Sequence, residues 1–109
     1  MLITTKKTLL PVLTILLSGC MAAESVQQRP PVFTAETTKS AEVYSNCVHE
    51  HWDELTVGAE RFTRPNGYRV RNRAGGIADV TSTATGAHVE MREPPLSGQS
   101  PVDAAKACL

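Results

Sequence analysis

The 109-residue sequence carries eleven lysine and arginine residues and eleven aspartate and glutamate residues, so its formal net charge is zero. Without a basic excess, neither nucleic acid nor an anionic membrane surface is indicated as the main partner. The chain has room for one domain of about seventy residues. A core of that size seldom suffices alone, and a disulfide or a metal commonly adds to the stability.

The N-terminal segment has the features of an export signal. Lys6 and Lys7 precede an apolar run that ends at Leu17, and two small residues follow it. The run is about ten residues long, whereas a transmembrane helix needs about twenty to cross the hydrocarbon core. We therefore predict a cleaved signal peptide over residues 1–19 instead of a permanent membrane span.

The end of this run, Leu17-Ser18-Gly19-Cys20, resembles the lipobox of bacterial lipoproteins. The resemblance covers the first fifth of the chain. It implies cleavage before Cys20, which would carry a diacylglycerol thioether and a further acyl chain such as palmitate. Several acyl chains anchor a protein firmly where one is marginal. Met21 stands where enterobacterial lipoproteins of the inner membrane have aspartate, which favours the periplasmic side of the outer membrane in a Gram-negative host.

Cys47 and Cys108 are the remaining cysteines. The lipoprotein resemblance assigns Cys20 to lipid and places the mature chain in an exported compartment, where disulfides persist. A disulfide between Cys47 and Cys108 is then the one pairing left. It would close a loop of about sixty residues and stabilise the fold by roughly 4 kcal/mol in the chain-entropy model. Two separate buried thiols are the alternative.

We predict residues 20–37 to be a lipidated flexible tether, because they are polar, contain prolines and offer little that could form a core face. From Thr38 to about Leu55, apolar residues recur at helical spacing. Thr37 or Thr38 is the expected N-cap of this helix, and Gly58 is its expected stop. The apolar stripe consists of Ala41, Tyr44, Cys47, Val48, Trp52 and Leu55.

Three later segments, 68–71, 78–81 and 87–92, alternate apolar and polar residues as strands with one buried face do. Short connections that contain glycine separate them, as is typical of antiparallel hairpins. The residues expected to face inward are Tyr68, Val70, Ala78, Val80, Val89 and Met91. A short helix is expected to begin with Ser100 as its N-cap and Pro101 in its first turn.

These elements predict an α+β fold in one small domain over residues 38–109. A helix is followed by a three-stranded antiparallel meander and a short C-terminal helix, and one disulfide joins the two helices. The predicted organisation of the whole chain is therefore a cleaved lipoprotein signal peptide, a lipidated tether and this single domain.

Two histidines and three acidic residues lie together at positions 49–54. On a helix, His49 and Asp53 share a face and could chelate one ion, whereas residues two apart diverge by about 200°. The segment departs from the metalloprotease motif H-E-x-x-H because Asp53 replaces the second histidine. A third ligand would have to be His88, which we expect on the solvent face of a strand. We expect no metal and no cofactor, and keep these three residues only as the metal alternative.

The one local concentration of charge is a series of arginines between residues 61 and 73. Strand alternation places Arg69, Arg71 and Arg73 on the outer face of the first predicted strand. Guanidinium groups pair bidentately with anions, so these residues could contact an anionic glycan, a lipopolysaccharide head group or an acidic envelope protein. The alternative is a solubilising edge strand, whose charges prevent pairing with other sheets.

We expect no enzyme activity, because no G-x-S-x-G motif is present and both mature thiols are assigned to the disulfide. The preferred hypothesis is a non-catalytic binding or accessory module of the cell envelope, anchored through lipid on Cys20. Its partners would be the membrane and an envelope protein or anionic glycan, and not nucleic acid. A second hypothesis is an inhibitor or immunity-type lipoprotein that inserts segment 94–99 or 61–67 into a hydrolase or toxin. A third is a periplasmic metal-binding protein.

Overall fold

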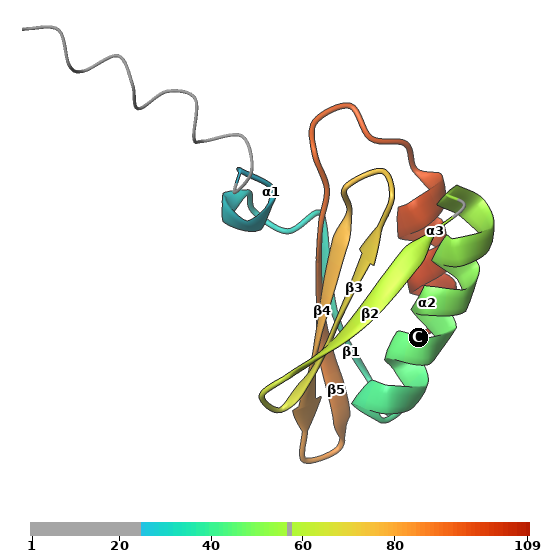
Figure 1. Ribbon diagram of the computed structural model, residues 1–109. Coiled ribbons are helices and arrows are strands. Elements are labelled where there is room, and N and C mark those ends of the chain that lie inside the picture. The colour runs from blue at the N-terminus through green and yellow to red at the C-terminus, as the bar shows by residue number, and fades with distance from the viewer. Residues whose placement is uncertain (1–24, 57) are drawn as a thin grey trace, which may run out of the picture.

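The structure is a computed structural model that describes residues 25–56 and 58–109 (Figure 1). The predicted signal peptide over residues 1–19, the lipidation of Cys20 and the first residues of the predicted tether lie outside the described residues. Within the described part, no helix combines the length and the apolar character that a membrane span requires. Export and lipidation therefore stay predictions.

The described chain forms a five-stranded antiparallel sheet with helices packed on one face (Figure 1). Its elements are α1 (Ser25–Gln28), β1 (Phe33–Thr37), α2 (Ala41–Thr56), β2 (Ala59–Arg64), β3 (Gly67–Asn72), β4 (Ile77–Thr83), β5 (Gly86–Arg92) and α3 (Ser100–Ala107). The strand order is β1-β5-β4-β3-β2. Strands β2 to β5 form a meander, and β1 adds to the free side of β5, so α2 crosses from one edge of the sheet to the other. The α+β class is confirmed, but the predicted three strands are only β3, β4 and β5.

The core lies between one face of the sheet and the pair of helices α2 and α3. The apolar residues of the alternating strands pack there against the apolar stripe of α2. Of the six residues predicted to face inward, five are buried and Tyr68 packs against the core while partly exposed. On α2, Tyr44, Val48 and Trp52 are fully buried. Leu55 is 48% exposed instead, because it lies in the last turn of α2, beyond the contact between Trp52 and the start of α3.

The predicted disulfide is confirmed and joins α2 to the end of α3. The Sγ atoms of Cys47 and Cys108 are 2.06 Å apart. Two hydrogen bonds hold the chain after α3 against the end of β1 and the segment that follows it. The ammonium group of Lys39 donates to the carbonyl of Cys108 at 2.6 Å, and the hydroxyl of Thr37 donates to the carbonyl of Leu109 at 3.0 Å. The C-terminal helix is therefore fastened at its far end by both covalent and polar contacts.

Two aromatic side chains of α2 also donate hydrogen bonds to the backbone of α3. The hydroxyl of Tyr44 donates to the carbonyl of Ala105 at 2.6 Å, and the indole N–H of Trp52 donates to the carbonyl of Pro101 at 3.0 Å. Burial raises the pKa of Tyr44, so its phenol stays protonated and remains a donor. These bonds fix the position of α3 along α2, because each of the two buried polar groups has a backbone partner in α3.

Strand β1 occupies the last five residues of the segment predicted as a flexible tether, residues 20–37. It pairs along its whole length with β5. Phe33, Ala35 and Thr37 face the core side, and the residues between them are exposed. The tether prediction is therefore wrong for residues 33–37, because the polar, proline-containing sequence before them obscured a short alternating segment.

Strand β2 was not among the predicted elements, and it pairs with β3 from Ala59 opposite Asn72 to Arg64 opposite Gly67. It forms an edge of the sheet, and four of its six residues are exposed. The arginine-bearing strand β3 therefore has neighbours on both sides, and its interpretation as an edge strand is wrong. Segment 61–67 is the end of β2, a tight turn and the first residue of β3, and not a free loop.

The helix caps also differ from the prediction. Ser40 caps α2 in place of the predicted threonines, and its hydroxyl accepts a hydrogen bond from the amide of Val43 at 3.1 Å. At α3 the N-cap is Gln99 instead of Ser100, and Pro101 lies in the first turn as expected. Such shifts of one to a few residues do not alter which faces the helices bury.

Candidate functional site

The sheet face opposite the helices carries part of the predicted arginine cluster. Val70 points into the core, so its neighbours Arg69 and Arg71 point to the open face, as predicted. Arg73 follows the end of β3, in the turn that leads to β4. The three arginines therefore lie in different surroundings.

Arg69 is held by Asp79 on the neighbouring strand β4. Its Nε donates to Oδ1 of Asp79 at 2.7 Å and its Nη2 donates to Oδ2 at 3.0 Å, which is a bidentate pair. Arg64, at the end of β2, contacts the same carboxylate at 2.9 Å. Hydrogen bonding to Asp79 raises the pKa of Arg69. Arg69 is therefore committed to joining β3 and β4.

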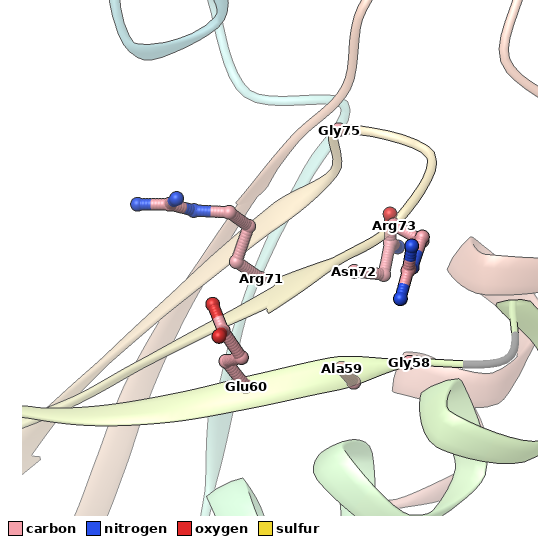
Figure 2. A pocket seen from close by; sticks show the side chains of 7 residues that line it. All are labelled: Gly58, Ala59, Glu60, Arg71, Asn72, Arg73 and Gly75. Atoms are coloured by element: carbon pink, nitrogen blue, oxygen red, sulfur yellow. The ribbon is translucent and has the colours of Figure 1, made fainter.

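Arg71 and Arg73 line a depression of about 530 Å³ at the end of the sheet where β2 begins and β3 ends (Figure 2). We call it the arginine pocket; its other lining residues are Gly58, Ala59, Glu60, Asn72 and Gly75. Figure 2 shows Arg71 and Glu60 extending from paired positions on the neighbouring strands β3 and β2, and Arg73 extending on the side of β3 opposite to Arg71. The guanidinium carbon of Arg71 lies 5.3 Å from the ring centre of Phe62, which restrains the side chain by a cation–π contact.

Gly58 leaves room for the side chain of Arg73. A Cβ atom at Gly58, where φ is +138°, would lie 2.9 Å from Nε of Arg73. The amide of Arg73 also donates to the carbonyl of Gly58 at 3.1 Å, which extends the β2–β3 pairing by one residue. The sequence predicted Gly58 only as a helix stop, and the glycine has this second role in shaping the pocket.

Asn72 forms a buried wall of the arginine pocket and is 4% exposed. Its Oδ1 accepts a hydrogen bond from the backbone amide of Gly76 at 2.9 Å, and the backbone amide of Asn72 donates to the carbonyl of Gly76 at 3.0 Å. Its Nδ2 has no hydrogen-bond partner among the described residues. A buried unpaired donor costs about 1–3 kcal/mol. The hydrogen bonds between Asn72 and Gly76 in the turn therefore hold this side chain in place despite the unpaired Nδ2.

His49 and Asp53 lie together as predicted, but both side chains are hydrogen-bonded to the backbone of Ala59. The carbonyl of Ala59 accepts a hydrogen bond from Nε2 of His49 at 3.1 Å, and Oδ1 of Asp53 accepts one from the amide of Ala59 at 3.0 Å. This pair therefore fixes the first residue of β2 to α2. His88 lies on the open face of the sheet beside Glu36, so the structure does not bring the three metal candidates together.

His88 forms a charged cluster that joins β1 to β5. Its Nδ1 contacts Glu36, its Nε2 contacts Glu90 at 3.3 Å, and Glu90 also contacts Arg92 at 3.1 Å. Hydrogen bonds to Glu36 and Glu90 raise the pKa of His88, and the hydrogen bond from His88 lowers the pKa of Glu90. The side chains are one third exposed or more, apart from Arg92. The cluster is therefore a screened surface contact.

We expect the substitution His88→Gln to make the free energy of unfolding less dependent on pH. The fold raises the pKa of His88. The contribution of His88 to the free energy of unfolding is therefore complete at pH values below its pKa in the unfolded chain, about 6.5, and is lost as the pH rises through its pKa in the fold. The variant should therefore be destabilised more at about pH 6 than at about pH 9, by about 0.2–1 kcal/mol per exposed pair. Urea unfolding at both pH values measures this, and an equal loss at both would contradict it.

A third side chain approaches the disulfide. The ligand atoms of Cys47, His51 and Cys108 lie within 4.8 Å of one another. Both sulfur atoms belong to the disulfide, however, and the thiolate is the form of cysteine that binds metal. In the oxidised chain this group is therefore a disulfide beside an exposed histidine.

No family model, curated protein or solved structure matches the chain. The arginine pocket therefore has to be understood from its own residues. The sequence pattern identified Arg71 and Arg73 but missed the opposite wall, because no strand was predicted at Ala59 and Glu60. The glycine before them was the only signal of a close approach in that segment.

Proposed function

We propose that the chain is a non-catalytic, lipid-anchored binding module of the cell envelope whose contact site is the arginine pocket. The observation that carries this proposal is the presence of Arg71 and Arg73 in one depression at an end of the sheet. Arg71 and Arg73 extend to different sides of β3 (Figure 2), so each guanidinium group can hold an anionic group through charge-assisted hydrogen bonds at its own side of the depression. The lipobox resemblance at Cys20 supports the anchor and an exported location, on the periplasmic side of the outer membrane in a Gram-negative host.

The mixed charge of the pocket favours an anionic glycan as the ligand. Glu60 lies opposite Arg71 in the β2–β3 pairing and lines the same depression. A carboxylate accepts hydrogen bonds from hydroxyl groups, whereas the arginines donate to anionic groups. A glycan that carries both kinds of group complements both kinds of side chain.

The double substitution Arg71→Gln/Arg73→Gln should weaken glycan binding at least about tenfold, because hydrogen bonds to charged groups contribute about 1.5–3 kcal/mol each. The probe is a fluorescein-labelled heparin hexasaccharide, which serves as a soluble anionic glycan. Its fluorescence anisotropy is measured with the intact lipoprotein in neutral detergent at fixed salt concentration.

The matched control is Lys39→Gln/Lys106→Gln, which removes the same charge from residues outside the pocket. Lys39 contacts the carbonyl of Cys108, and Lys106 stands over the ring of Phe33. If the control weakened binding as much as the arginine variant, the attraction would be a general charge effect and the pocket would not be the site.

The anchor is tested in the same expression host. Cys20→Ala should abolish incorporation of radiolabelled palmitate and should release the chain from the membrane fraction or stall its processing. Unchanged labelling and unchanged membrane fractionation would contradict the proposed lipid anchor.

A further inference from the structure

The folded body begins much closer to Cys20 than the sequence suggested. Nε of Arg29 donates to the carbonyl of Glu93 at 2.8 Å, and Nε of Arg92 donates to the carbonyl of Arg29 at 2.9 Å. The amide of Val32 donates to the carbonyl of Met91 at 2.7 Å. The chain is therefore fixed to the end of β5 before β1 begins.

Few residues remain to separate a lipid on Cys20 from this body. Ser25 is the first residue of α1, and five Cα–Cα steps lead to it from Cys20. Even a fully extended chain spans no more than about 18 Å in five steps. Once Cys20 is acylated, the α1 end of the domain must therefore lie within that distance of the bilayer surface.

The same end of the domain carries the arginine pocket. Figure 1 shows α1, the turn between β3 and β4 and the loop between β5 and α3 at one end, and the start of α2 at the other. Val26 and Gln27 of α1 line a shallow depression together with Arg71 and Gly75. These last two residues also line the arginine pocket, so α1 and the pocket are neighbours.

A fully exposed leucine lies in the loop at this end. Leu96 has a relative exposure of 103% and a φ angle of +65°. The hydroxyl of Ser97 donates to the carbonyl of Pro94 at 2.9 Å across this residue. A left-handed backbone is unfavourable for leucine, and an aliphatic side chain in water forgoes its burial. The loop therefore holds an apolar group outward at the cost of local strain, which is typical of a contact site.

We propose that this end of the domain rests on the lipid bilayer, with Leu96 inserted at the boundary of headgroups and acyl chains and the arginine pocket bound to the anionic glycan headgroup of a lipid. This inference rests on the proposed acylation of Cys20 and names the source of the proposed glycan. The bilayer is the occupant because the short connection to Cys20 places it there. An apolar side chain beside guanidinium groups also matches the interface, where acyl chains lie under anionic headgroups.

The contact does not have to be strong in isolation. One leucine and two arginines would bind a free domain to membranes only weakly. The anchor makes the second contact intramolecular, so the effective concentration of the bilayer around this end is high. A weak contact then suffices to set the orientation of the domain.

The test places a tryptophan at Leu96. The variant Leu96→Trp, purified as the lipoprotein, is reconstituted into vesicles of lipopolysaccharide and phosphatidylcholine in equal parts, with the phosphatidylcholine brominated on its acyl chains. Bromine quenches only nearby indoles, so most of the added emission should be lost relative to vesicles without bromine. The native Trp52 is fully buried and gives the same background in every variant.

The matched control is Val43→Trp, in the first turn of α2 at the opposite end of the domain, where Val43 is 54% exposed. Its added emission should stay unquenched. Mass spectrometry first establishes acylation, so a failed anchor is distinguished from a failed orientation. In acylated protein, quenching at both positions or at neither would overturn the inference, and the latter would instead favour a protein cleft as the partner of segment 94–99.

Discussion

Replacing both disulfide cysteines, Cys47→Ser/Cys108→Ser, should lower the free energy of unfolding by about 4 kcal/mol. The bond links residues 61 positions apart, and in the chain-entropy model its removal returns the freedom of that loop to the unfolded state. Small domains have total stabilities of about 5–15 kcal/mol, so the loss is a large share. Urea unfolding followed by the fluorescence of the buried Trp52 measures the change.

The loss should appear first in α3. This helix has eight residues, which is too short to be stable in isolation. Without the disulfide, its main ties to α2 are the hydrogen bonds from Tyr44 and Trp52. Amide hydrogen exchange in α3 should therefore accelerate more than exchange in β3 and β4, which lie between other strands.

Reductant provides the control for this experiment. The native chain unfolded under reducing conditions should show the midpoint of the double variant, and the double variant itself should not respond to reductant. If the native midpoint were the same with and without reductant, the disulfide would not be a main source of stability.

The parts of the fold that the sequence predicted share one property, a residue pattern dominated by the core. In β3, β4 and β5, residues such as Val70, Val80 and Val89 alternate with polar residues, and all three are buried. On α2, a helical stripe meets the same core. Where one face of an element is buried and the other is exposed to solvent, the periodicity of apolar residues alone distinguishes a helix from a strand.

The two edge strands lack that pattern, for reasons visible in their packing. In β2, Arg61 takes an inward position, where it stacks over the ring of Tyr68 at 4.2 Å and donates to the hydroxyl of Ser45 at 3.0 Å. In β1, the inward Thr37 is buried and donates to the carbonyl of Leu109. A polar residue with tertiary partners replaces the apolar one that the pattern requires, so both strands resembled connections.

The candidate site, like the fold, could be predicted from the sequence only in part. Alternation placed Arg69 and Arg71 on the open face, but the partner of Arg69 depends on the register of β3 and β4, which places Arg69 opposite Asp79. The second wall of the arginine pocket depends on β2. Local sequence contains neither the register nor the unrecognised strand, so it predicted the chemistry of the site without its shape.

Gly86→Ala should destabilise the domain by about 1–3 kcal/mol, the usual cost of overpacking. A Cβ atom at Gly86 would lie 1.9 Å from the carbonyl oxygen of Thr37 and 2.8 Å from Cα of Thr38. Both contacts are with backbone, so the end of β1 must move away from β5. The matched control is Gly98→Ala, whose Cβ would meet nothing within 4 Å and which should change stability by less than about 0.5 kcal/mol.

The effect of Gly86→Ala should be local to β1 and should leave the membrane contact unchanged. Amide exchange in residues 33–37 should accelerate relative to β3, because β1 has β5 as its only neighbour in the described sheet. The contacts of Arg29 and Val32 with the end of β5 precede β1 and lie at its other end, so they should keep the connection to Cys20 short. Quenching of Leu96→Trp by brominated lipid should therefore be the same with and without Gly86→Ala. If Gly86→Ala and Gly98→Ala had the same effect on stability and exchange, residues 33–37 would be a tether after all.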